Sequence, residues 1–148
     1  WRVETKPYRP RLVSGQRLRF VLRANPVIRS RDDNGRQHRH DVVMRAKRVA
    51  QESGTPPGEE ELLREAAVPW LAQRGPRNGF DVNEREVVVD SYHQHQIPRR
   101  GGWAIRFSTV DYEGILTVGD PERLLRSLGE GIGPSKAFGC GLLLVRPA

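Results

Sequence analysis

The order of strand-like and helix-like segments is the feature that most constrains the fold of this 148-residue chain. Residues 17–24 alternate well, with apolar residues 18, 20, 22 and 24 on one face and Arg17, Arg19 and Arg23 on the other, which predicts a half-buried strand with a basic outer face. Residues 80–97 are rich in residues that favour strands, and residues 103–118 continue the pattern. We therefore expect two further strands, joined by a turn at 98–102.

Two segments carry helix signals. An apolar stripe predicts a helix over 59–73, which Pro69 should kink or divide. A second helix is expected after the N-cap Asp120 and should end at Gly129, before a last strand at 142–145. The resulting order predicts an α+β, ferredoxin-like (RNA-recognition-motif-like) βαββαβ fold, a four-stranded antiparallel sheet with two helices on one face.

Other segments are less sharply patterned. Residues 30–40 form a polar, arginine-rich tract around a turn, and residues 41–51 suit either a short strand or a helical turn. Gly114 suggests a bulge in its strand. The prolines within residues 1–14 favour an extended linker or the tail of a preceding domain, so we expect the folded domain to span 15–148. Because the chain opens on Trp rather than Met, we expect that sequence of the biological molecule is missing ahead of Trp1.

The amino-acid composition indicates which kinds of molecule this chain can bind and where it can work. Lys and Arg number 25 against 18 Asp and Glu, for a net charge of +7, which favours a polyanion and nucleic acid first. A single cysteine, Cys140, excludes an internal disulfide and suggests a cytoplasmic protein. No apolar run approaches the roughly 20 residues of a membrane span, so no membrane association is expected.

The segment 129–141 contains five glycines and one lysine. Glycines leave backbone N–H groups uncovered and allow positive φ, so such a loop can wrap around a phosphate, with Lys136 as a mobile cation. The alternative interpretation is a flexible turn, whose glycines let the following strand pack closely.

Arginines gather in two further places. Arg99 and Arg100 lie at the predicted turn between the two long strands, where a basic finger could enter a nucleic-acid groove. A second group lies in the tract after the first strand, at Arg29, Arg31, Arg36 and Arg39. Ordinary solvation of charged turns is the alternative for both groups.

The four histidines form two His-x-His pairs, at residues 38 and 40 and at residues 93 and 95. Two histidines without a nearby cysteine or carboxylate are a weak metal signal. We expect neither a metal nor another cofactor, and no complete catalytic constellation in this chain.

Several stretches in the correct order resemble the CasE family, the CRISPR-associated endoribonucleases of type I-E Cascade. The glycine-rich stretch with its flanks is the most specific, and the similarity covers almost the whole chain. The stretches are residues 22–26 (LRANP), 41–44 (DVVM), 112–118 (YEGILTV) and 131–143 (GIGPSKAFGCGLL).

The resemblance implies two tandem ferredoxin-like domains that cut the repeat of precursor CRISPR RNA at the base of its stem-loop, without metal. The 2′-hydroxyl attacks the scissile phosphate and leaves a 2′,3′-cyclic phosphate, and the protein stays bound as a Cascade subunit. The family's catalytic histidine and its tyrosine partner lie in the N-terminal domain, so no histidine here inherits that role. The partners implied are the repeat stem-loop and other Cascade subunits.

The resemblance implies that this chain binds the RNA substrate rather than cutting it. The residues expected to bind RNA are Gly131, Gly133, Ser135, Lys136, Gly139 and Gly141 of the glycine-rich loop, together with Arg99 and Arg100, which are chosen from charge and position alone. Either Lys136 or an arginine of the turn would stabilise charge at the scissile phosphate. The alternatives are a general RNA-binding module, an assembly piece that meets acidic proteins and, more distantly, a metal-dependent histidine nuclease.

Overall fold

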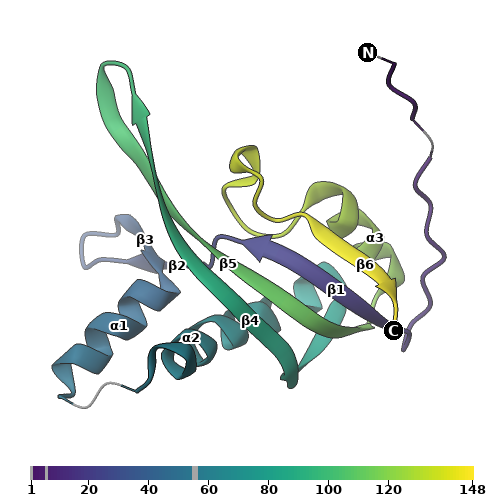
Figure 1. The fold of residues 1–148 in the computed structure, drawn as a ribbon, viewed down its shortest axis with the longest axis horizontal. Coiled ribbons are helices and arrows are strands. Elements are labelled where there is room, and N and C mark those ends of the chain that lie inside the picture. Colours follow the sequence, from purple (N-terminus) through teal and green to yellow (C-terminus); the bar gives the residue numbers. More distant parts are fainter. Residues whose placement is uncertain (1, 6, 55–56) are drawn as a thin grey trace.

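The computed structural model describes residues 2–5, 7–54 and 57–148. Figure 1 shows how its elements are arranged. In chain order they are β1 (Arg17–Ala24), β2 (Val27–Arg31), β3 (Gln37–Asp41), α1 (Val42–Glu52), α2 (Glu59–Arg74), the short 3-10 helix η1 (Pro76–Asn78), β4 (Phe80–Arg99), β5 (Gly102–Val118), α3 (Pro121–Glu130), the 3-10 helix η2 (Lys136–Phe138) and β6 (Leu143–Pro147).

Four strands form an antiparallel sheet in the order β4-β5-β1-β6. The helices α2 and α3 cover one face of this sheet and leave the other face open (Figure 1). This strand order is the one that two interleaved βαβ units produce, so the structure confirms the expected α+β, ferredoxin-like fold.

The core lies between the sheet and these two helices. Tyr112 of β5 is fully buried, its hydroxyl donates to the carbonyl of Ala67 in α2 at 3.2 Å, and its ring stacks on Trp70 with the centroids 6.2 Å apart. Burying a large apolar side chain contributes about 1.5–3 kcal/mol, so such contacts hold α2 on the sheet. From β1 the core receives every second residue, namely Leu18, Phe20, Leu22 and Ala24.

The tract 30–40, for which the sequence indicates only a turn, is largely a β-hairpin formed by β2 and β3. Its tip is closed by Asp32, whose carboxylate accepts the backbone N–H groups of residues 34 and 36, and by Gly35 with φ of 76°. The register of the hairpin sets Arg29 directly opposite Arg39. Two cations in register repel each other, so this pairing is retained at a cost.

Residues 41–51, where the sequence allows a strand or a helical turn, form most of the 11-residue helix α1. Asp41 explains where this helix starts, because its carboxylate accepts the first exposed N–H groups, those of residues 43 and 44. The same carboxylate accepts hydrogen bonds from the hydroxyls of Tyr92, at 3.1 Å, and Ser108. One side chain therefore caps α1 and ties it to β4 and β5.

Two local predictions had different outcomes. The helix α2 continues through Pro69 to Arg74, so the proline starts no second helix. The bulge expected at Gly114 lies in the partner strand, where the register with β5 shifts between residues 82 and 87. A side chain on Gly114 would place its Cβ 2.3 Å from the carbonyl oxygen of Glu86, so the glycine lets the bulged strand approach.

The remaining boundaries differ by one to three residues from expectation. α3 ends at Glu130 rather than Gly129, and β6 begins at Leu143 and reaches Pro147. Residues 2–5 and 7–13 form no helix or strand. Among the described helices, none has the length and apolar character needed to cross a lipid bilayer.

Candidate nucleic-acid interface

Three connecting segments gather at one end of the sheet. Since neighbouring strands are antiparallel, β1 and β4 end where β5 and β6 begin. The β2–β3 hairpin, the β4–β5 turn and the loop before β6 therefore extend from the same end, as Figure 1 shows. These segments contain the glycines and arginines singled out in the sequence, so the topology alone brings the predicted binding residues to one end of the molecule.

The glycine-rich loop, residues 131–142, is held in place by its own backbone. The N–H of Gly141 donates to the carbonyl of Arg23 at the end of β1 at 2.7 Å, and the N–H of Ile132 donates to the carbonyl of Gly141 at 2.8 Å. Gly141 is buried with φ of 92°. The amides of Gly131 and Gly139 also donate within the protein, to Ser127 and Lys136. These three glycines therefore shape the loop.

The outer part of the loop, residues 133–136, differs from these glycines in its backbone hydrogen bonds. Within the described chain, no acceptor is recorded for the backbone N–H groups of Gly133, Ser135 and Lys136. Ser135 adopts φ of 63°, and its hydroxyl accepts a hydrogen bond from the side-chain amide of Asn25 at 2.7 Å. Lys136 is exposed. Amides without an internal acceptor and one exposed ammonium group are the donors with which a nest binds an anion, and we call residues 133, 135 and 136 the nest below.

Beyond Val110, the last partner of β1, the strands β4 and β5 pair only with each other and project as an arm, residues 93–109 (Figure 1). At its tip Arg99 pairs with Gly102, and both Arg99 and Arg100 are exposed. Neither forms an ion pair with any residue in the described ranges. The arm thus carries Arg99 and Arg100 well away from the sheet body.

The sequence did not predict two features of the aromatic side chains on the arm. Trp103 is 97% exposed near the tip of the arm, although its alternation with residues 105 and 107 suggested only a strand position. Phe107 of the arm stacks between His95 and Phe138, with ring centroids 4.7 Å and 5.0 Å away. This stack joins the arm to the glycine-rich loop. No spacing in the sequence connects residues 107 and 138, so only the fold reveals the contact.

Three of the four histidines have ordinary local partners in the structure. His38 contacts Asp32 at 2.9 Å, His40 contacts Ser30 at 2.8 Å, and the ring of His95 contacts the hydroxyl of Thr109 at 2.9 Å. In the portion of the chain that the structure describes, no three His, Cys, Asp or Glu side chains are placed to hold a metal ion. Cys140 is buried, and burial raises the pKa of its thiol, as expected for a packed residue rather than a nucleophile.

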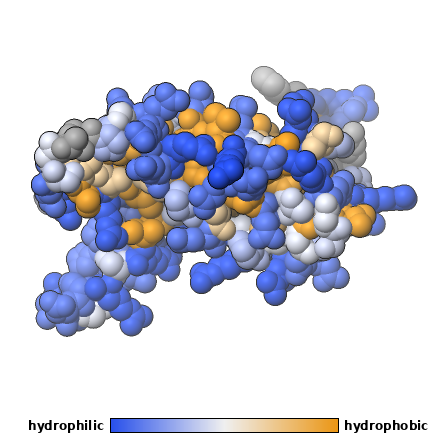
Figure 2. Space-filling model, turned by 90° about the horizontal axis from the view of Figure 1, so that it is seen from below, coloured by the Kyte–Doolittle hydropathy of each residue, from blue (hydrophilic) through white to orange (hydrophobic). Residues whose placement is uncertain are grey.

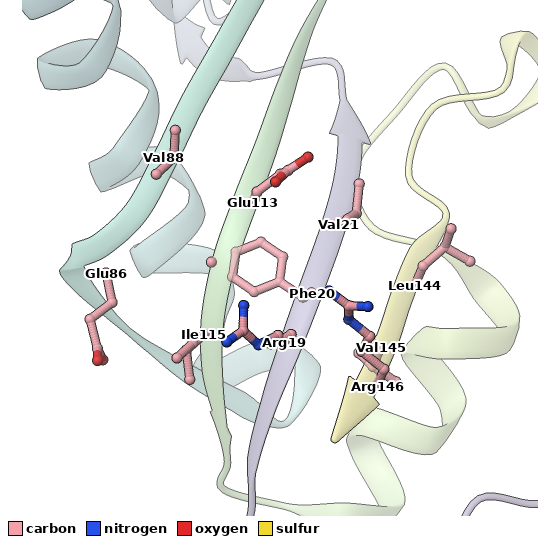
Figure 3. A pocket seen from close by; sticks show the side chains of 11 residues that line it. Arg19, Phe20, Val21, Glu86, Val88, Glu113, Ile115, Leu144, Val145 and Arg146 are labelled. Carbon is pink, nitrogen blue, oxygen red and sulfur yellow. The ribbon is translucent and has the colours of Figure 1, made fainter. Parts of the chain in front are cut away.

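The open face of the sheet has mixed chemistry. A shallow hollow of about 400 Å³ lies over β1, β5 and β6, and Figure 3 shows the side chains around it. Arg19 and Arg146 line it together with the carboxylates Glu86 and Glu113, of which Glu86 pairs with Arg17 at 2.6 Å. Exposed apolar side chains surround them, as Val21, Val88 and Leu144. Seen from below, the protein shows hydrophobic patches between hydrophilic residues (Figure 2).

One ion pair with two hydrogen bonds lies on the same face. The guanidinium of Arg23 donates two hydrogen bonds to the carboxylate of Asp111, at 2.6 Å and 2.7 Å. These bonds lower the pKa of Asp111 and raise the pKa of Arg23. The pair joins β1 to β5 directly beside the carbonyl that anchors the glycine-rich loop, so the sheet supports that loop.

Comparison with known proteins identifies the family. The profile of the family described as CRISPR associated protein matches residues 1–147. The chain is 36% identical over 151 residues to the CRISPR-associated endoribonuclease Cse3 of Thermus thermophilus, covering 96% of this chain and 61% of that protein. It is 30% identical to the CRISPR system Cascade subunit CasE of Escherichia coli, covering 98% and 65%. The chain thus spans less than two thirds of the length of these relatives.

Solved structures agree with this assignment. The CRISPR endoribonuclease Cse3 bound to a 19 nt RNA superposes with a TM-score of 0.67 at 35% identity, covering 96% of this chain and 61% of that one. Thermus thermophilus Cse3 bound to an RNA that represents a pre-cleavage complex gives 0.63 at 35% identity, covering 96% and 59%. By sequence and by fold, the chain belongs to the CasE family of CRISPR-associated proteins.

Proposed function

We propose that this chain is the RNA-gripping part of a CRISPR RNA endoribonuclease and that it binds the repeat stem-loop. The observation that carries the proposal is the gathering of open loop amides, Lys136 and the arginine-tipped arm at one end of the sheet. The arm would enter a groove of the stem with Arg99 and Arg100, while the nest at Gly133, Ser135 and Lys136 would receive a backbone phosphate. A relative of this chain is named an endoribonuclease, and a similar structure holds RNA.

Cleavage in this proposal requires a catalytic histidine from an N-terminal ferredoxin-like domain outside this chain, with residues 1–14 as linker and 15–148 as the C-terminal domain. The greater length of the relatives leaves room for such a domain. The 2′-oxygen would bond to phosphorus while the bond to the 5′-oxygen breaks, leaving a 2′,3′-cyclic phosphate and a 5′-hydroxyl without a metal ion. Lys136 would stabilise the charge that develops on the phosphoryl oxygens.

The affinity of the chain for a hairpin RNA at low salt tests the proposed RNA-binding surface. Lys136→Ala and the double variant Arg99→Ala/Arg100→Ala should each weaken binding by about 1–3 kcal/mol, because each removes charge-assisted contacts. Arg85→Ala, an exposed arginine of β4 outside the proposed surface, is the matched control. Affinities equal to that control in both variants would remove the proposed surface.

Cleavage is tested with the longer parent protein and a labelled repeat RNA. Full activity in EDTA with a 2′,3′-cyclic phosphate product is expected, and loss of activity in EDTA would favour a metal-dependent nuclease instead. Residues 1–148 alone should bind the hairpin without cutting it. Equal affinity for any single strand would favour a general RNA-binding module.

The open sheet face favours a second, compatible role in assembly. Val21, Val88 and Leu144 expose apolar surface around the hollow of Figure 3, and such surface usually meets another protein surface. We infer that other Cascade subunits, or another part of the parent protein, contact this face. Complexes recovered after nuclease treatment would support protein contacts, whereas their loss would show that RNA alone holds them.

A further inference from the structure

A second basic surface lies on the helix side of the sheet, away from the arm tip. A cavity of about 720 Å³ is bounded by the β2–β3 hairpin, the C-terminal end of α2 and the glycine-rich loop. Five cationic side chains and one carboxylate, Glu130, line it. The cations, which together define the basic groove, are Arg29, Arg39, Arg74, Arg77 and Lys136.

These cations lack anionic partners. Other basic residues, such as Arg17, Arg23 and Lys47, pair with carboxylates at 2.6–2.8 Å. No ion pair to the five groove cations occurs among residues 2–5, 7–54 and 57–148. Five cations that converge around a single carboxylate raise the local potential and attract anions.

Arg74 shows that this convergence is built into the fold. Its guanidinium donates to the carbonyl of Val27 at 3.3 Å and lies over the ring of Trp70, 4.8 Å from the centroid. Burial lowers the pKa of Arg74, and the neighbouring charges of Arg77 and Arg29 lower it further. The fold thus holds the guanidinium of Arg74 half-buried and beside other cations. A bound anion would reduce the repulsion between these charges.

The groove suits a sugar–phosphate backbone better than a base. Among the described residues, Trp70 is the only aromatic one that lines the groove, and this side chain is 4% exposed and lies under the guanidinium of Arg74. It donates its indole N–H to the carbonyl of Val27 at 3.0 Å, so it is committed to the fold. Recognition of a base usually needs a free stacking face or polar groups aimed at base edges, whereas arginines suit phosphates.

We propose that the basic groove binds phosphodiester groups of RNA, as a second contact that continues from the nest at Lys136 along the helix side of the domain. This inference rests on the proposed function, because it assumes that RNA is the partner. Lys136 belongs to both surfaces, so one strand can pass from the glycine-rich loop into the groove between β2 and α2. Phosphates are the chemistry recognised, and RNA is the source to which the proposal commits.

The test compares two charge-matched double variants of the full chain. Arg39→Gln/Arg77→Gln removes two exposed groove cations for which the structure records no hydrogen bond, so folding should persist. Arg85→Gln/Arg126→Gln removes the same charge from exposed positions that do not line the groove. Affinity for a hairpin RNA carrying single-stranded flanks is measured over a range of salt, and thermal unfolding checks that both variants are folded.

The groove variant should bind about tenfold or more weakly than the control variant, since two charge-assisted contacts are lost. The slope of log affinity against log salt should also become shallower by about 1.5, at roughly 0.7–0.9 per phosphate contact. Equal affinity and slope in the two variants would overturn the proposal. So would inorganic phosphate that binds the wild-type chain tightly without competing with RNA, since the groove would then be a small-anion site.

The two proposals fail differently. If the wild-type chain binds no hairpin RNA at low salt, both are wrong. If it binds RNA and loses affinity in the Arg99→Ala/Arg100→Ala variant, while the groove variant matches its control, only the groove proposal is wrong.

Discussion

At the residue scale, the glycines of the loop divide into two kinds. Gly141 has φ of 92°, and a Cβ there would lie 2.6 Å from the carbonyl oxygen of Ile132. Gly139 has a similar φ of 82°, but a Cβ there would meet nothing within 4 Å. The first glycine is required by both conformation and space, and the second by conformation alone.

Alanine substitution should separate these two requirements. Gly139→Ala should destabilise the protein by about 1–2 kcal/mol, the cost of a left-handed conformation for an L-residue. Gly141→Ala should cost clearly more, because the backbone must also move away from the carbonyl of Ile132. Urea unfolding followed by circular dichroism measures both. Equal losses of unfolding free energy in the two variants would show that the close contact at residue 141 does not affect stability.

At the element scale, α1 depends on a single carboxylate. Asp41 caps the helix and also accepts the hydroxyls of Tyr92 and Ser108. Burial is the main reason that the pKa of Tyr92 is raised to about 12, so this phenol stays protonated and able to donate at any ordinary pH. The helix, the hairpin before it and the base of the arm therefore share one polar junction.

Removing this carboxylate should loosen α1. We expect Asp41→Ala to destabilise the protein by about 2–4 kcal/mol, the sum of a lost cap and of two hydroxyls left without their acceptor. Asp41→Asn keeps the capping oxygen and should lose about half as much. Hydrogen exchange should show faster exchange in α1 than in β1. A loss below about 1 kcal/mol for Asp41→Ala would contradict this account.

At the scale of the whole molecule, the ion pair between Arg23 and Asp111 links stability to pH. The folded state lowers the pKa of Asp111 below its ordinary value of 3.8, chiefly through the hydrogen bonds from Arg23. The stabilisation is therefore fully present above pH 3.8 and is lost as the pH falls through the lower folded-state value. Because the arginine is largely exposed, the contribution should be about 1 kcal/mol or less.

A double-mutant cycle checks this contribution. Asp111→Asn and Arg23→Gln should each lower the free energy of unfolding at pH 7 by about 0.5–1 kcal/mol, and the double variant should lose little more than either one. All three variants should lose less stability than the wild type when the pH falls below 3.8. Strictly additive losses at pH 7 would show that the pair does not act as a unit.

Much of the fold could be predicted from particular residues. The alternation in residues 17–24 defines the inner and outer faces of β1, and Asp120 with the following proline starts α3 where expected. The sequence did not predict the hairpin β2–β3 and left helix α1 undecided between a strand and a helical turn. Their local patterns are weak, and they are stabilised by long-range contacts, such as those from Tyr92 and Ser108 to Asp41.

The candidate site also has some features that the sequence predicts and others that only the tertiary structure shows. Charge and glycine content by themselves predict that Arg99, Arg100 and Lys136 contribute to a polyanion-binding surface, because these properties belong to the residues and need no partner. Only the tertiary structure decides which loop amides stay uncovered, that Phe138 stacks on the arm, and that Arg74 converges with the β2–β3 hairpin. Those features depend on distances between segments far apart in the chain, which strand pairing and helix packing set and local periodicity does not encode.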